Sequence, residues 1–363
     1  MKALHIGTEN KKNSKIKSYP AFDLLRFVLA SIVVLEHANF QFLDFMTGSL
    51  AVKVFFALSG WLIGGILLRS ELSELPKFFF NRSTRIWIPY FVAIVILYSI
   101  AFIREGVDFF WVKYLIKDLT FTHHLYLRFP EANYEMPLHG SGNQFWSICV
   151  EEIFYLFAPI ILLLLPKGKS AGLWLIISIT AIYLKSHFGA ISLGVLAAIV
   201  QNRYEFSHKP SARVLSLLFI CISISLLYQS EIIDADFITP IFSIAVVVFL
   251  AFPGPRSSVA MFLGGVSYPL YLNHWLGLAF VNGSLKHLGF ENLLIQPLIA
   301  YVASIFLTVP LYIFIDKFVM AHREKWFSPS LGKRLGVAAY CLLATGIIAS
   351  TLMDKYGPHG IAL

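Results

Sequence analysis

The sequence has 363 residues, of which 57% are hydrophobic and only 14% are charged. A soluble globular domain carries about 25% charged residues, so the composition excludes an ordinary water-soluble protein and predicts an integral membrane protein. The net charge of +8 does not indicate nucleic-acid binding, because no basic run is interleaved with aromatic residues. The three cysteines lie in apolar runs without CxxC or CxxH spacing, which indicates neither a metal site nor a disulfide framework.

Apolar windows of about twenty residues predict the membrane helices. In chain order these windows are residues 22–40, 50–68, 86–103, 145–165, 171–185, 188–201, 213–229, 237–252, 259–281, 292–315 and 335–352. The predicted fold is therefore an all-α polytopic membrane protein. It has a tail at 1–21, a transmembrane core of about ten helices at 22–320, and an additional helix with a short tail at 321–363.

The distribution of basic residues predicts the orientation. With the N-terminus in the cytoplasm, the inner segments hold twenty Lys and Arg residues and the outer ones eight, as the positive-inside rule requires. A cleaved signal peptide is disfavoured, because Arg26, Glu36 and His37 interrupt the first apolar run. The longest hydrophilic stretch, 104–144, is then outside, where we expect it to cover an outward opening.

The first helix carries charged groups that hydrocarbon does not favour. In "FDLLRFVLASIVVLEHANF", Arg26 and His37 are eleven residues apart, which puts both on one face with His37 about 16 Å deeper. A buried ionisable group at that depth indicates a functional site, and a neutral imidazole suits a general base. Asp23 and Arg26 are one turn apart and also fit a plain interfacial ion pair. Glu36 points about 100° away from His37.

Two later helices carry further polar faces. In "NQFWSICVEEIFYLFAPI", Ser147, Glu151 and Tyr155 recur every four residues, and Glu151 is a candidate to orient the histidine. In "LGGVSYPLYLNHW", Tyr271 and His274 lie within one turn, although Tyr and His near a span end are also common interfacial anchors.

The predicted inner loop "RSELSELPKFFFNRSTRIWIPY" holds Arg69, Arg82 and Arg85. Inner loops are commonly basic, but Arg82 and Arg85 at the entry to a helix also form a fork that suits phosphate oxygens.

Together these segments resemble the acyltransferase type 3 family over about residues 20–320. "FDLLRFVLASIVVLEHA" is similar to the family's Arg, ten residues, His signature, and "VKVFFALSGWLIGGIL" to its second helix. "FFFNRSTRIWIPYF" resembles the basic entry to the third helix, "FWSICVEEIFYLF" the Trp-Ser-x-x-x-Glu-x-x-x-Tyr helix, and "LGGVSYPLYLNHW" a late helix. The sequence departs from the family after Asp316, where relatives have an acidic-x-Pro element.

The resemblance implies O-acyl transfer, commonly of acetyl from cytosolic acetyl-CoA, to a hydroxyl of a cell-surface polysaccharide or lipid-linked sugar. The implied catalytic residues are His37, Glu151 and Arg26. The implied donor-binding residues are Arg82, Arg85 and Arg69, and the implied substrate contacts are Ser59, Ser147, Tyr155, Tyr271 and His274. It implies acyl-CoA as a substrate rather than a tightly bound cofactor, and a bacterial inner-membrane location.

Some relatives carry a soluble esterase-like domain after the membrane part, for which we expect no room here. His37 would deprotonate the acceptor hydroxyl directly or carry the acyl group itself. The principal alternative is a transporter or flippase for a polar or lipid-linked substrate, because intramembrane polar residues also line transport routes. A sensor or scaffold is a third possibility.

Overall fold

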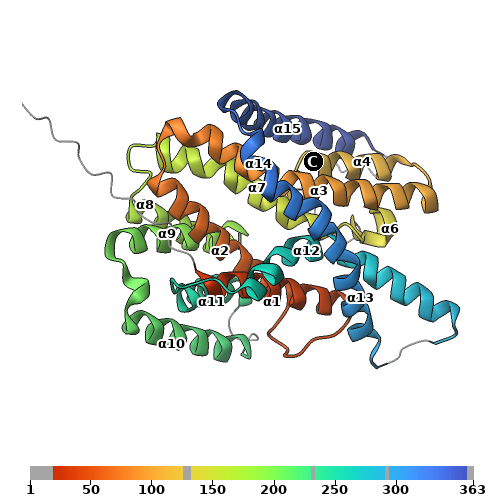
Figure 1. Ribbon diagram of the computed structural model, residues 1–363, viewed down its shortest axis with the longest axis horizontal. Helices are drawn as coiled ribbons and strands as arrows, with labels where there is room; N and C mark the ends of the chain where they lie inside the picture. The colour runs from red at the N-terminus through yellow and green to blue at the C-terminus, as the bar shows by residue number, and fades with distance from the viewer. Residues whose placement is uncertain (1–18, 126–131, 230–233, 291–293, 358–363) are drawn as a thin grey trace, which may run out of the picture.

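The computed structural model describes residues 19–125, 132–229, 234–290 and 294–357 (Figure 1). Helices make up most of these residues, and no strand occurs among them. The longer helices are α1 (Pro20–His37), α2 (Gly48–Arg69), α3 (Leu75–Glu105), α4 (Phe109–Leu119), α7 (Phe145–Pro159), α8 (Ala171–Tyr183), α9 (Phe188–Tyr204), α10 (Pro210–Leu227), α11 (Ala235–Leu250), α12 (Ser258–His287), α13 (Gln296–Leu311), α14 (Lys317–Trp326) and α15 (Pro329–Tyr356). Two short helical segments, α5 (Ala132–Glu135) and α6 (Pro137–Gly140), lie between α4 and α7.

Each of the eleven predicted windows contains a helix. Six helical stretches in the described part of the chain are long and apolar enough to cross a membrane, and two shorter ones, α8 and α11, are also apolar. The predicted all-α polytopic membrane fold is confirmed. The first helix is not among the six, since its 18 residues include Asp23, Arg26 and Glu36. The N-terminal tail of the prediction lies almost wholly outside the described residues.

The stretch 104–144, which the sequence predicts to be an outside loop, is partly helical. It contains α4, whose first turn is capped by Asp108: the Oδ1 atom of Asp108 accepts a 2.7 Å hydrogen bond from the backbone N–H of Trp111. The helix packs against α3 and α15 and buries Tyr114 and Lys117. With eleven residues, which include charged ones, α4 is too short to cross a membrane.

Small residues let α2 and α9 pack closely. A Cβ atom on Gly60 would lie 2.0 Å from the carbonyl oxygen of Ile191, and one on Gly194 would lie 2.2 Å from that of Ala57. Such close backbone contact is how membrane helices associate without a hydrophobic driving force. The crossing fixes α2, which carries Ser59 beside Gly60.

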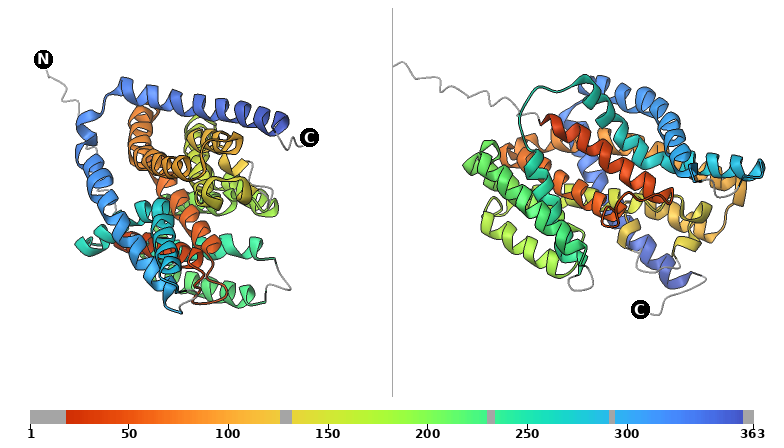
Figure 2. Two further views of the ribbon diagram at one scale, coloured as in Figure 1. Left: turned by 90° about the vertical axis from the view of Figure 1, so that its right-hand side faces the viewer. Right: turned by 90° about the horizontal axis from the view of Figure 1, so that it is seen from below.

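The additional C-terminal helix α15 lies along α3 and α4 (Figures 1 and 2). Near its C-terminal end, Asp354 makes ion pairs with Lys113 at 2.9 Å and Lys117 at 3.1 Å, both from α4. Lys117 is only 2% exposed. This buried contact attaches α15 to the core.

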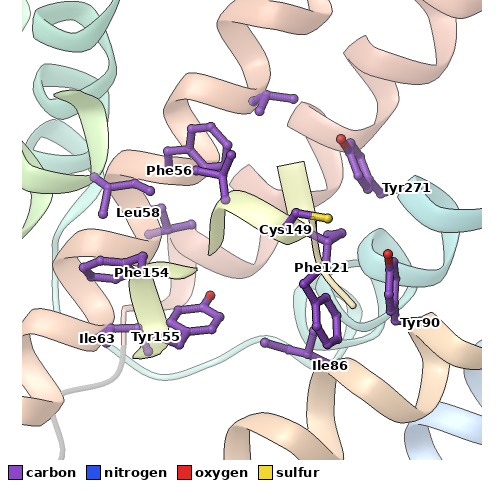
Figure 3. Close-up of a cluster of buried hydrophobic side chains, with 14 of the residues drawn as sticks. Phe56, Leu58, Ile63, Ile86, Tyr90, Phe121, Cys149, Phe154, Tyr155 and Tyr271 are labelled. Carbon is purple, nitrogen blue, oxygen red and sulfur yellow. The ribbon is translucent and has the colours of Figure 1, made fainter. Parts of the chain in front are cut away.

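Helix α1 lies at the centre of the arrangement that positions the polar residues. It contacts α2, α12 and α13, and α7 in turn contacts α2. Figure 3 shows side chains of α7, among them Cys149 and Tyr155, between residues of α2 and α3. Beyond Pro310 the chain changes from α13 to a π-helical segment, Tyr312–Asp316, and then to α14, which is where a proline is expected to disturb helical hydrogen bonding.

Candidate active site

His37 and His274 are in direct contact, although 237 residues separate them in the sequence. His37 is the last residue of α1 and is exposed, whereas His274 in the middle of α12 is 1% exposed. The Nδ1 atom of His37 lies 2.7 Å from Nε2 of His274. The sequence singled out both histidines but did not pair them.

Tyr271 and Ser147 join the same end of α12 to α7. Their hydroxyl oxygens are 2.7 Å apart, and the hydroxyl of Tyr271 also donates to the carbonyl oxygen of Gln144 at 3.0 Å. The side-chain amide of Gln144 donates to the carbonyl of Leu272 at 2.9 Å. All of these groups are buried, so the contacts hold the two helices in one register.

Glu151 is bound one turn further along α7. The Ser59 hydroxyl on α2 donates to Oε1 of Glu151, and the Tyr155 hydroxyl donates to Oε2, each at 2.7 Å. The two hydroxyl oxygens lie 3.1 Å apart. The structure therefore brings Ser59, Glu151 and Tyr155 into one network (Tyr155 is labelled in Figure 3). In the structure it is His274, not Glu151, that contacts His37.

The neighbouring carboxylates face elsewhere. Glu152 accepts a 3.0 Å hydrogen bond from the indole N–H of Trp87 on α3, which is the adjacent face that the helical spacing predicts. Glu36 accepts a 2.7 Å hydrogen bond from the backbone N–H of Gly48 and so caps the start of α2. Both carboxylates therefore have hydrogen-bond partners other than the histidine pair, although Glu36 also interacts electrostatically with His37.

Arginine side chains gather at the N-terminal end of α1. Arg26 contacts Asp23 at 3.4 Å and interacts electrostatically with Arg82, Arg85 and Glu151. The guanidinium carbon of Arg82 lies 5.4 Å from the centre of the Tyr155 ring, a cation–π distance. Among the described residues, no carboxylate lies within ion-pair distance of Arg82 or Arg85. We refer to Arg26, Arg82 and Arg85 as the arginine cluster.

Two arginines near this cluster were not predicted. Arg256, just before α12, contacts Asp23 at 3.4 Å, and Arg323 on α14 interacts electrostatically with Arg85. Their signal in the sequence was only that both fall in predicted inner segments. Asp316, in the π-helical segment, interacts electrostatically with Arg85.

Arg69 does not share this arrangement. It is exposed at the C-terminal end of α2, and its guanidinium nitrogens lie near Gly65 of the same helix. Arg69 is the last residue of α2, whereas the arginine cluster lies on α1 and α3.

His123 belongs to a separate hydrogen-bond network. His123 is 1% exposed, and its Nδ1 atom lies 2.5 Å from Oδ1 of Asp118, whose Oδ2 atom accepts a hydrogen bond from the Tyr98 hydroxyl at 2.7 Å. Burial, with smaller contributions from His187 and His123, lowers the pKa of His124 to about 4. In the described part of the chain, none of these groups contacts His37.

The chain is thus an all-α membrane protein in which α1 contributes Arg26 to the arginine cluster near one end and His37 to the histidine pair at the other. The family model described as "Acyltransferase domain", of acyltransferase type 3, matches residues 19–316. The chain belongs to the acyltransferase type 3 family, which confirms the resemblance seen in its motifs.

Curated relatives agree with the family. A Staphylococcus aureus (strain COL) protein named as a candidate O-acetyltransferase is 27% identical over 325 residues, which covers 75% of this chain and 52% of the relative. The peptidoglycan O-acetyltransferase OatA of Listeria monocytogenes is 30% identical over 163 residues, or 42% of this chain and 25% of OatA. Nodulation protein 10 of Rhizobium leguminosarum bv. viciae is 28% identical over 200 residues, which covers 49% of this chain and 52% of the relative.

The chain spans about half the length of the staphylococcal relatives that it matches. No solved structure matches it.

Proposed function

We propose that this protein is a membrane O-acetyltransferase that moves an acetyl group from acyl-CoA to a hydroxyl of a cell-surface glycan. Family membership and the names of its relatives support acyl transfer to oxygen. The relative OatA is named as acting on peptidoglycan, which makes a peptidoglycan sugar the first acceptor to test.

The arginine cluster carries the proposal for the donor. Arg82 and Arg85 have no carboxylate within ion-pair distance among the described residues, although Glu151 interacts electrostatically with Arg82 and Asp316 with Arg85. Arg82 is half-buried, and a half-buried cation without a close ion pair favours an added counter-charge. The phosphates of CoA supply that charge, and guanidinium groups bind phosphate oxygens in a fork. Glu151, held by Ser59 and Tyr155, keeps the aromatic ring of Tyr155 under the guanidinium of Arg82.

The length of α1 sets the distance between the proposed donor site and the proposed base. His37 lies eleven residues beyond Arg26, a rise of about 16 Å, which is comparable to an extended pantetheine arm. Phosphates at the arginine cluster would therefore place the thioester near His37. With the N-terminus in the cytoplasm, as the basic residues predict, the proposed donor site is on the cytoplasmic side of the bacterial cell membrane and the proposed acceptor site at the far end of α1.

The chemical step transfers the acetyl group from the sulfur of CoA to the oxygen of the acceptor hydroxyl. The acceptor hydroxyl oxygen attacks the thioester carbonyl carbon while the imidazole of His37 takes the hydroxyl proton. The carbon–sulfur bond then breaks, and the same imidazole returns the proton to the CoA thiolate. A variant of this route, in which His37 first accepts the acetyl group, uses the same donor site.

The test is glycan O-acetylation in cells that lack the gene, complemented with wild type, His37→Ala or His287→Ala. His287 is exposed in the last turn of α12 and is the matched control. Ester-linked acetate on isolated peptidoglycan and polysaccharides is measured by mass spectrometry. We expect wild type and His287→Ala to restore it and a normally expressed His37→Ala protein to leave it absent. Full restoration by His37→Ala would refute the role of His37, and an unchanged acetate content in the deletion strain would refute the proposed activity.

A further inference from the structure

The contact between His37 and His274 has only one consistent set of hydrogens. At 2.7 Å, one ring nitrogen must donate a hydrogen and the other must accept it. The direction follows from the second nitrogen of His274. Its Nδ1 atom lies 2.9 Å from the backbone carbonyl oxygen of Tyr271, and a carbonyl oxygen can only accept, so this Nδ1 carries the hydrogen.

His274 is buried, and among the described residues no carboxylate contacts its ring. A buried imidazole without a counter-charge is neutral and has a single N–H group. Since that group is on Nδ1, the Nε2 atom of His274 holds a lone pair and accepts a hydrogen from Nδ1 of His37. Neutral His37, the form that can act as a base, is therefore the Nδ1–H tautomer, and its own Nε2 atom holds the free lone pair.

Neighbouring helices keep His274 in place. The backbone carbonyl of His274 accepts a 2.9 Å hydrogen bond from the hydroxyl of Ser304 on α13. That contact requires the small residue one turn later, because a Cβ atom on Gly277 would lie 2.3 Å from the hydroxyl oxygen of Ser304. Tyr271, whose carbonyl holds the imidazole, is itself bound to α7 through Ser147. The acceptor nitrogen of His274 is therefore held by groups on α7, α12 and α13.

We propose that His274 is a positioning residue that fixes His37 in the Nδ1–H tautomer and so presents Nε2 of His37 as the proton acceptor. The proposal rests on the proposed function, in which His37 is the base. His37 is exposed, and no hydrogen bond made by the described residues occupies its Nε2 atom, so an acceptor hydroxyl can reach it. When Nε2 takes the proton, Nδ1–H of the resulting imidazolium remains bound to the lone pair of His274. A neutral imidazole thus takes the place that a carboxylate holds in other histidine-based sites.

The test compares His274→Gln with His274→Phe in purified protein that releases CoA from acetyl-CoA in the presence of peptidoglycan fragments. The amide oxygen of glutamine can lie near the position of Nε2 and accept the same hydrogen, whereas phenylalanine fills the space without an acceptor. We expect His274→Gln to keep kcat within about tenfold of wild type. We expect His274→Phe to lower kcat by about 100-fold, the scale of general base catalysis, with KM for acetyl-CoA unchanged.

A second measurement reads the tautomer directly and needs no variant to be active. In protein labelled with 15N at histidine, the imidazole signals of His37, assigned by their loss in His37→Gln, should show a protonated Nδ1 and an unprotonated Nε2. An Nε2–H tautomer of His37 in the wild type would overturn the proposal, even if His274→Phe does not fold.

The kinetic outcomes separate the role of His274 from that of His37. If folded His274→Phe keeps wild-type kcat while His37→Ala is inactive, the positioning role of His274 is wrong and the proposed function stands. If His37→Ala keeps full activity, the proposed function loses its base whatever His274 does. Inactive but folded His274→Gln with an unchanged His37 tautomer would also count against the proposal.

Discussion

Replacement of Arg82 by alanine tests the donor site with a magnitude that follows from the structure. The guanidinium lies 5.4 Å from the Tyr155 ring centre and has no carboxylate within ion-pair distance among the described residues, so its N–H groups are available to a phosphate. A hydrogen bond to a charged group contributes about 1.5–3 kcal/mol. Loss of that amount weakens CoA binding by about 10- to 150-fold. Arg82→Lys keeps the charge without the fork, and we expect an intermediate loss.

Titration calorimetry of the purified protein with CoA measures this change. The matched control is Arg104→Ala, in the last turn of the same helix and about 33 Å from Arg82 along its axis. We expect Arg104→Ala and Arg69→Ala to bind CoA within about twofold of wild type. Equal weakening by Arg82→Ala and Arg104→Ala would mean that the effect is general electrostatics. An unchanged Kd in folded Arg82→Ala would refute the arginine cluster as the donor site.

Three further predictions concern other contacts. Tyr155→Phe removes one of the two hydroxyl donors of Glu151 and should lower thermal stability by about 1.5–3 kcal/mol, measured by unfolding in detergent, whereas an unchanged melting temperature would show that the bond is not formed. Asp354→Asn removes the carboxylate that Lys117 contacts and should release α15, so that limited proteolysis cuts there faster than in wild type; equal cleavage rates would contradict this. The lowered pKa of His124 means that the unfolded chain binds a proton that the folded chain does not, so stability should fall as pH decreases from about 6.5 to 4. His124→Gln should reduce this acid sensitivity in melting-temperature profiles, and identical profiles would exclude the contribution.

The membrane helices could be predicted because hydrocarbon imposes a single rule on length and polarity. The rule applies to each window alone, and all eleven windows contain helices. It missed α4, whose eleven residues include Lys113, Lys117 and Asp118, because a short amphipathic helix resembles a loop in a hydropathy profile. The capping residue Asp108 followed by the run "FFWVKYL" was the available signal.

The sequence predicts which residues of the candidate site share a face of one helix, but it does not predict the contacts between helices. Helical spacing puts Arg26 and His37 on one face, and Ser147, Glu151 and Tyr155 on another, and it separates Glu152 from them. It says nothing about which face of a distant helix lies opposite. The pairing of His37 with His274 depends on the packing of α1 against α12, and that of Glu151 with Ser59 on the packing of α7 against α2. The sequence groups Arg69 with Arg82 as donor-binding residues because both fall in one predicted inner loop.

In the proposed mechanism, a CoA thioester bound by the arginine cluster brings its acyl carbon to His37. An acyl-CoA analogue with a photoreactive acyl chain tests it without knowledge of the acceptor. The analogue is added to inside-out membrane vesicles and irradiated, and the labelled peptides are identified by mass spectrometry. We expect label on the peptides that contain His37 or His274, and we expect it to be removed by excess CoA and strongly reduced in Arg82→Ala. Label confined to the exposed surface of α10, or label at the histidines that excess CoA does not diminish, would contradict it.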